Sequence, residues 1–364
     1  MNKELLFNLY AIHSPSGSEK RMRRFLKKQA AACGATSIEQ DRLGNLFITK
    51  GTSDTYPCLA AHMDQVQRYH SKDFRVFEHD GVAFAFSARS MAQQGLGADD
   101  KNGIFICLEC LRRYDVLKVA FFVGEETGCV GSRACDLSFF RDCRFIVQPD
   151  RHGGHDLITD MFCGDVCSEE FVQAIGADAF GYKHDSGSIT DVGELTERGV
   201  GISCLNLSCG YYKAHSDQEV TVLPELENCL NFVCHIIETC TAVYPFQGGR
   251  RTYSFGGFGH SKGWYEDDET YYYECGYYDE DIETMRQYLG IQPDVSLDEI
   301  RRSCISEFHA FCFFDSKECD AMLSDIYTFV KDECTGAHWW DDDDLVGDTV
   351  GQLVEDTRSL RKVS

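Results

Sequence analysis

Short apolar runs alternate with helical segments through the first 245 residues, and this alternation constrains the fold more than any other feature. The runs have the length and composition of buried strands, and they lie at residues 46–49, 58–62, 116–123, 144–147 and 204–209. Helical patterns lie between or after them, at residues 21–33, 104–114 and 223–241. Strands that alternate with helices predict an α/β fold with a mixed, largely parallel sheet sandwiched by helices.

Two local signals refine this prediction. Ser16 and Glu19 have the spacing of a capping box just before the helical segment 21–33. Asp80 and Gly81 separate two alternating apolar runs, which is a strong signal for a β-hairpin. We therefore expect a capped helix at the first position and a hairpin at the second.

The charge distribution divides the chain. The formal net charge is -24, and residues 251–364 hold 26 acidic against 10 basic residues. Residues 247–263 are rich in glycine and indicate a linker or exposed loop. We therefore expect a main domain at 1–246 and a small acidic, mainly helical domain at 264–364. Such acidity disfavours nucleic acid and anionic membranes as partners.

The 19 cysteines indicate a reducing compartment. Their number is odd, and they form no small-domain disulfide framework. Residues 1–16 carry no apolar signal segment, and no run approaches a membrane span. We therefore expect a cytoplasmic protein with reduced thiols. Cys107 and Cys110 fall in a helical pattern, where they are expected to be small buried side chains rather than a metal or redox pair.

Acidic residues and histidines follow the apolar runs, at the place where open α/β sheets gather their binding sites. These residues are His62, Asp64, Asp99, Asp100, Glu125, Glu126, Asp150 and His215. Carboxylates and imidazoles are ligands for zinc, with cobalt or manganese as alternatives. The pattern predicts a site for two divalent metal ions, with one carboxylate free to act as a base.

Three of these segments are weak signals when taken singly. His62 and Asp64 would point to the same face of a strand, so one could bind a metal while the other orients it. Asp99 and Asp100 precede a helix, where acidic residues are favoured without any ligand. A single histidine in a turn, such as His215, is usually an ordinary surface residue.

Glu125 and Glu126 are the most specific local signal. Two adjacent carboxylates at the end of a buried strand are costly to desolvate unless a cation lies near them. Because they are adjacent, they point in different directions, so one can bind metal while its neighbour holds water. Asp150 follows another apolar run, and His152 and His155 are competing candidate ligands beside it.

Taken together, the segments resemble the co-catalytic zinc peptidases, a superfamily that includes peptidase T-like tripeptidases, aminopeptidases and acylamino-acid deacylases. The resemblance covers about residues 1–245, and all the matching segments occur in the order of the family. They are residues 60–64, 97–101, 124–128 with Gly131 and Ser132, 148–150 and 210–219. It implies the family fold, a mixed, largely parallel sheet between helices.

The resemblance also implies roles for the matched residues. The metal ligands that it implies are His62, Asp99 and Asp150 for one ion and Asp99, Glu126 and His215 for the other. Glu125 would be the general base, and Asp64 would hold the imidazole of His62. Many relatives insert a lid domain in one of two gaps, but these gaps hold only 36 and 64 residues here, too few for a separate domain.

Our leading hypothesis is a two-metal hydrolase that cleaves amide bonds of short peptides, as an aminopeptidase. An N-acyl amino-acid deacylase or carboxypeptidase is the first alternative; it would need a cationic clamp, for which Arg151, Lys183 and Lys213 are candidates. A non-catalytic binding protein on the same scaffold is the second. The native metal, the side-chain preference and the oligomeric state are left open by the sequence.

Overall fold

The computed structural model describes residues 1–161 and 164–248. The expected end of the main domain at residue 246 lies just inside this part of the chain. The expected linker at 247–263 extends beyond it, and the acidic helical domain at 264–364 lies outside the described residues altogether. Both therefore stay predictions.

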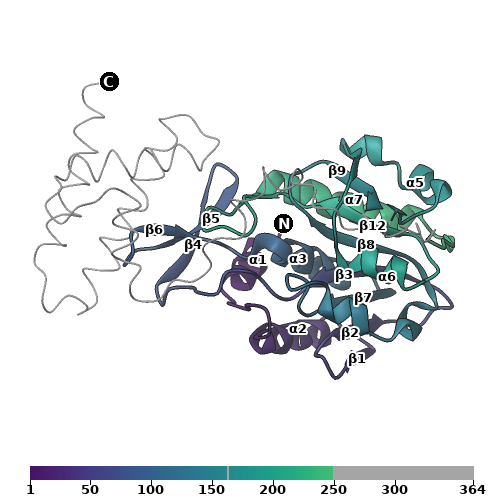
Figure 1. Cartoon of the computed structure of the whole chain (residues 1–364), viewed down its shortest axis with the longest axis horizontal. Coiled ribbons are helices and arrows are strands. Elements are labelled where there is room, and N and C mark those ends of the chain that lie inside the picture. The colour runs from purple at the N-terminus through teal and green to yellow at the C-terminus, as the bar shows by residue number, and fades with distance from the viewer. Residues whose placement is uncertain (162–163, 249–364) are drawn as a thin grey trace, which may run out of the picture. The chain divides into compact units, whose positions relative to one another are not determined.

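A nine-stranded sheet forms the centre of the described part (Figure 1). Along the sheet the strands are β1 (Ser37–Gln40), β2 (Leu46–Lys50), β7 (Leu117–Phe122), β3 (Tyr56–His62), β8 (Cys143–Arg151), β12 (Cys204–Ser208), β9 (Asp156–Met161) and β10 (Gly164–Asp165), with β11 (Lys183–Ser186) also paired to β9. The four central strands, β7, β3, β8 and β12, pair in parallel. Strands β2 and β9 join them antiparallel on either side. The predicted mixed, largely parallel sheet is confirmed.

Helices cover both faces of this sheet. On one face α3 (Ala98–Arg113) packs across the central strands, and around it lie α1 (Lys3–Tyr10), α2 (Lys20–Ala32), α5 (Glu169–Ile175) and α7 (Leu223–Thr239). On the other face α6 (Asp191–Glu197) packs against the sheet and α4 (Val130–Ala134) packs against α6. The described part also contains two short 3-10 helices, at Leu137–Phe140 and Ala177–Phe180.

The central strands are apolar on both sides because both sides are covered. In β3, Leu59 and Ala61 belong to the apolar cluster under α3, whereas Cys58 and Ala60 belong to the cluster under α6. This alternation explains why the strands appear in the sequence as continuous apolar runs. Among the described residues, no helix has the length and apolar character needed to cross a membrane.

A smaller sheet lies to one side of the larger one (Figure 1). Its strands are β13 (Tyr211–Tyr212), β14 (Val220–Val222), β5 (Val82–Ser87) and β4 (Phe74–His79), with β6 (Ala92–Gln94) paired to β5. The predicted hairpin is confirmed: Asp80 and Gly81 join β4 to β5 with φ values of 46° and 82°. Strands β4, β5 and β6 lie in the first of the two gaps in which relatives insert a lid, and the turn between β13 and β14 carries His215.

The N-terminal region differs from the prediction in two ways. Helix α1 was not predicted from the sequence, and the capping box that was predicted before α2 is not formed. The Ser16 hydroxyl donates to Asp64 Oδ2 at 2.8 Å, and no side chain caps α2. In a capping box the Ser16 oxygen would accept from a backbone N–H, but here the hydroxyl donates to an ionised carboxylate, which makes a strong hydrogen bond.

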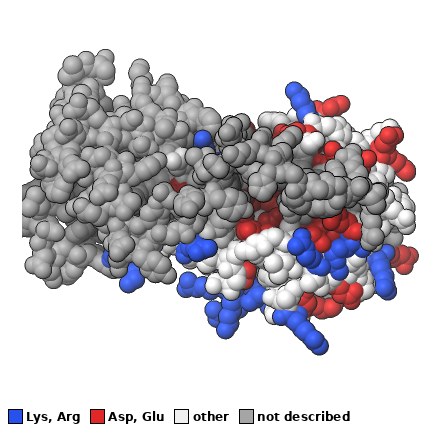
Figure 2. Space-filling model, in the orientation of Figure 1, with Lys and Arg blue, Asp and Glu red and all other residues white. Residues whose placement is uncertain are grey.

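Helix α2 is a strongly basic part of the described surface. Helix α2 carries six basic and no acidic residues among its 13. In Figure 2 a group of Lys and Arg side chains, in blue, lies along the lower edge, where Figure 1 shows α2. Acidic side chains, in red, gather across the middle of the same face.

Removing the hydroxyl of Tyr10 should destabilise the protein, because this group ties α1 to the core. It lies 2.6 Å from Asn102 Oδ1 and 2.9 Å from Thr221 Oγ1, and all three side chains are buried. We expect Tyr10→Phe to lower the free energy of unfolding by about 1–3 kcal/mol, measured by urea denaturation. The control is Tyr69→Phe, at a side chain that is 64% exposed. Equal midpoints for the two variants would contradict the prediction.

Candidate metal centre

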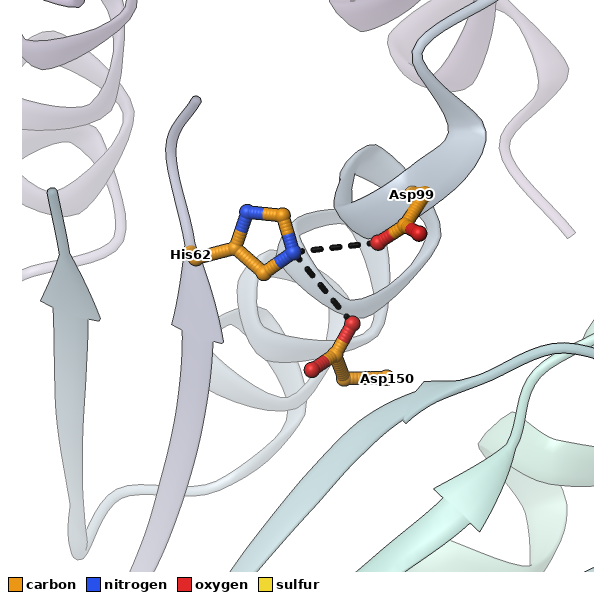
Figure 3. A group of neighbouring side chains, drawn as sticks. All are labelled: His62, Asp99 and Asp150. Carbon is orange, nitrogen blue, oxygen red and sulfur yellow. Dashed lines mark hydrogen bonds and ion pairs between the residues drawn. The ribbon is translucent and has the colours of Figure 1, made fainter. Parts of the chain in front are cut away.

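Five of the predicted residues converge in two groups that share Asp99. The Nε2 atom of His62 lies 3.0 Å from Asp99 Oδ1 and 3.3 Å from Asp150 Oδ1 (Figure 3). The Nε2 atom of His215 lies 3.1 Å from Asp99 Oδ2 and 2.9 Å from Glu126 Oε2. Within each group the candidate ligand atoms all lie within 4.8 Å of one another. Asp99 thus faces one histidine with each of its two oxygens.

The topology of the sheets explains this convergence. His62 ends β3, Asp150 lies near the end of β8, and Glu126 follows β7. These three strands are parallel neighbours, so their carboxyl ends lie at the same edge of the sheet. His215 is brought to that edge by the turn between β13 and β14, and Asp99 by the first residues of α3.

The start of α3 separates Asp99 from Asp100. Both residues have non-helical backbone angles, and the peptide bond between them is cis. The Asp100 carboxylate accepts hydrogen bonds from the backbone N–H groups of His62, at 3.2 Å, and Gly103, at 2.9 Å. Asp100 therefore anchors the helix start to β3, while the side chain of Asp99 faces the two histidines.

Glu219 is a residue of this centre that the sequence interpretation missed. Its buried carboxylate accepts hydrogen bonds from the backbone N–H groups of Gly97, at 2.5 Å, and Asp99, at 3.0 Å. Burial raises the pKa of Glu219 to about 7. It lies in the matched stretch 210–219, but only the pairing of β14 with β5 in the smaller sheet brings it to the Asp99 loop.

Asp64 touches both His62 and the Glu125–Glu126 turn. The Nδ1 atom of His62 lies 3.0 Å from the carbonyl oxygen of Asp64 and 3.5 Å from its Oδ1 atom. The Asp64 carboxylate also accepts hydrogen bonds from the backbone N–H of Glu125, at 3.0 Å, and of Glu126, at 3.3 Å. The Asp64 side chain therefore links the end of β3 to the turn that follows β7.

Asp150 is oriented by two neighbours that carried no expected role. Gln148 Nε2 and Thr190 Oγ1 donate hydrogen bonds to its Oδ2 atom, at 2.9 and 3.2 Å. Its Oδ1 atom is therefore the one that faces His62. Asp191, also buried, accepts hydrogen bonds from Gln148 and from Ser132, at 3.3 and 2.6 Å. Asp191 therefore helps to hold the Gln148 side chain that orients Asp150.

The buried carboxylates and the histidine of this centre have pKa values far from their ordinary values. Burial and the neighbouring Asp99 raise the pKa of Glu126 to about 7, and burial raises that of Asp150 to about 7. Burial alone would lower the pKa of His215, but Asp99 and Glu126 raise it to about 12. The Oε1 atom of Glu126 is buried without a hydrogen-bond partner. Imidazoles, carboxylates and an unsatisfied carboxylate oxygen fit a pair of divalent ions.

Glu125 stands beside these groups without belonging to either. Burial raises the pKa of its carboxyl well above the ordinary value, and Asp150 and Asp191 add to this effect while His62 opposes it. The thiol of Cys129 is 3.7 Å from its Oε1 atom. Glu125 is thus a carboxyl group that favours carrying a proton next to a cluster of metal-type ligands.

The other sequence candidates lie apart from the two groups. His152 and His155 are exposed and belong to neither group. Arg151 is ion-paired to two carboxylates, at 3.6 Å from Asp156 and 3.8 Å from Asp185. The remaining candidate clamps for a substrate carboxylate, Lys183 and Lys213, are exposed.

The fold is shared with solved peptidases. Aminopeptidase PepT from Bacillus cereus ATCC 10987 is similar with a TM-score of 0.54 and 16% identity, over 66% of this chain and 99% of that chain. A tripeptidase from Staphylococcus aureus subsp. aureus mu50 has a TM-score of 0.53 and 16% identity, over 65% of this chain and 97% of that chain. No family model and no curated protein matches the sequence. The predicted resemblance to co-catalytic zinc peptidases is confirmed at the level of the fold.

Replacing the shared carboxylate of Asp99 should lower the metal affinity of both groups of candidate ligands. We expect Asp99→Asn to lower the affinity for zinc at both positions by more than about 100-fold, measured by metal content after dialysis and by calorimetric titration. The control is Asp54→Asn, at an exposed loop residue, which should bind metal as the parent protein does. Retention of two tightly bound ions by Asp99→Asn would show that Asp99 is not shared.

Proposed function

We propose that the protein is a two-metal aminopeptidase that hydrolyses amide bonds of short peptides. The observation that carries the proposal is the position of Asp99, whose two oxygens lie 3.0 Å from His62 and 3.1 Å from His215. A carboxylate placed in this way can bind two cations side by side, the arrangement of two-metal hydrolases. The fold shared with solved peptidases supports the same class of reaction.

Each ion would have three ligands from this chain. His62, Asp99 and Asp150 would hold one, and Asp99, Glu126 and His215 the other. The mixture of imidazole and carboxylate suits zinc, with cobalt and manganese as alternatives. When bound, the ions would act as Lewis acids that polarise the scissile carbonyl and stabilise the charge that develops on its oxygen.

Glu125 would serve as the general base. Its carboxyl lies beside both ligand groups without joining them, so it could take a proton from water and pass it to the leaving amine. Asp64 would be a positioning residue, because it holds the backbone N–H groups of Glu125 and Glu126. The base and one metal ligand would thereby keep a constant separation.

The preference for a free amino terminus rests on charge. Besides the candidate ligands, the carboxylates of Asp64, Asp191 and Glu219 lie around the two groups, so a substrate ammonium would lie in acidic surroundings. A carboxypeptidase or deacylase needs a fixed cation for the substrate carboxylate. Of the three candidates, Arg151 is already paired with Asp156 and Asp185, which favours the aminopeptidase over this alternative.

Replacing Glu125 should separate chemistry from metal binding. Glu125→Gln removes a proton acceptor and no ligand, so we expect kcat to fall about 100-fold or more while both metals stay bound. Peptide hydrolysis and metal content should be measured on the same samples, with Glu4→Gln, at an exposed residue, as the matched control. A near-normal kcat in Glu125→Gln would remove the base from the proposal.

The choice of substrate end can be tested directly with matched pairs of substrates. We expect the metal-loaded protein to cleave unblocked di- and tripeptides and amino-acid anilides, and to act at least about tenfold more slowly on their N-acetylated counterparts, because these lack the ammonium. Equal rates would favour the deacylase alternative. Metal binding with no turnover of either set would favour a non-catalytic binding protein.

A further inference from the structure

A second cluster of reactive groups lies where α3 and α7 meet, apart from the metal ligands. Cys110 and Arg113 are three residues apart on α3, so they share one face of that helix. Cys234 lies on α7, which packs against α3, and its thiol interacts with that of Cys110. The NH1 atom of Arg113 donates a hydrogen bond to Cys234 Sγ at 3.3 Å. A guanidinium and a second thiol thus both meet the same sulfur atom.

These contacts favour the ionised form of Cys234. The interaction with Cys110, to which Tyr114 and Arg113 add, lowers the pKa of the Cys234 thiol to about 6 against the effect of burial. The same interaction, together with burial, raises the pKa of Cys110 well above its usual value. Because the guanidinium of Arg113 touches Cys234, a thiolate is favoured there and a thiol at Cys110, which is the division of roles that disulfide formation needs.

A second thiol pair provides an internal comparison. Cys58 and Cys143 also interact with each other, but they are 0% and 1% exposed, and their thiols donate to the backbone carbonyls of Leu59 and Phe139. Burial raises the pKa of Cys58 well above its usual value, so this thiol is a poor nucleophile. Cys234 is 9% exposed, and the Arg113 side chain beside it is 40% exposed. A small polar oxidant can therefore approach the first pair from solvent.

We propose that Cys234 and Cys110 form an oxidation site, at which hydroperoxides join α7 to α3 through a disulfide. The Cys234 thiolate attacks one peroxide oxygen, the O–O bond breaks, and sulfenic acid and hydroxide form. The sulfur of Cys110 then attacks the sulfenic sulfur, and the hydroxyl group leaves with the Cys110 proton as water. The two thiols lose two electrons in total, and the peroxide is reduced by the same two electrons.

The test uses the full metal-loaded chain treated with hydrogen peroxide. Free thiols are then blocked, and disulfide-linked peptides are identified by mass spectrometry. We expect a Cys110–Cys234 link to form while Cys58 and Cys143 stay reduced. In Cys110→Ser, we expect no link and a sulfenic acid on Cys234 that dimedone captures. Free thiols at both positions after treatment, or oxidation no faster than at the Cys58–Cys143 pair, would overturn the proposal.

The role of Arg113 has its own readout. Alkylation of Cys234 by iodoacetamide should rise with pH around a midpoint near 6 in the parent protein. In Arg113→Gln the midpoint should move upward, and alkylation at pH 6 should be about tenfold slower. The matched control is Arg112→Gln, whose guanidinium pairs with Glu109 and Gln29 instead. An unchanged midpoint in Arg113→Gln would show that the guanidinium does not activate the thiol.

Discussion

The candidate site depends on one buried carboxylate, that of Asp99, held between two histidines that come from distant parts of the chain. His62 arrives from the end of a central strand and His215 from a turn of the smaller sheet. Burying a carboxylate is costly unless each oxygen has a partner. Here each oxygen has one, and the backbone N–H of the same residue is held by Glu219. The two sheets and the start of α3 must therefore come together before this centre exists.

Orientation within the centre comes from residues around the candidate ligands rather than from the ligands themselves. Gln148 and Thr190 occupy one oxygen of Asp150 and leave the other to face His62. Asp64 holds the turn that contains Glu125 and Glu126. Partners of this kind keep a ligand set in place before any ion binds, which reduces the ordering that binding requires.

The thiol pair follows the same physical rule as the metal centre: the partners of a buried group decide its charge. Cys234 is ionised more easily because Cys110 and Arg113 stabilise its thiolate, whereas burial raises the pKa of Cys58 and keeps it neutral. Cys234 and Cys58 have chemically identical side chains, so the difference between them comes from their surroundings. Reactivity in this protein therefore follows local donors and solvent access rather than residue type.

The sequence by itself determined the parallel core, the hairpin at Asp80 and Gly81, and the candidate residues at the strand ends, because apolar runs and turn residues are local patterns. Tertiary structure decided the rest. Ser16 bonds to Asp64 instead of capping a helix, Glu219 reaches the Asp99 loop, and Cys234 meets Cys110 across two helices. These partners are 48 to 124 residues apart, and no local period or spacing records which distant side chain will be nearest. Only packing of the sheets and helices brings such pairs within hydrogen-bonding distance.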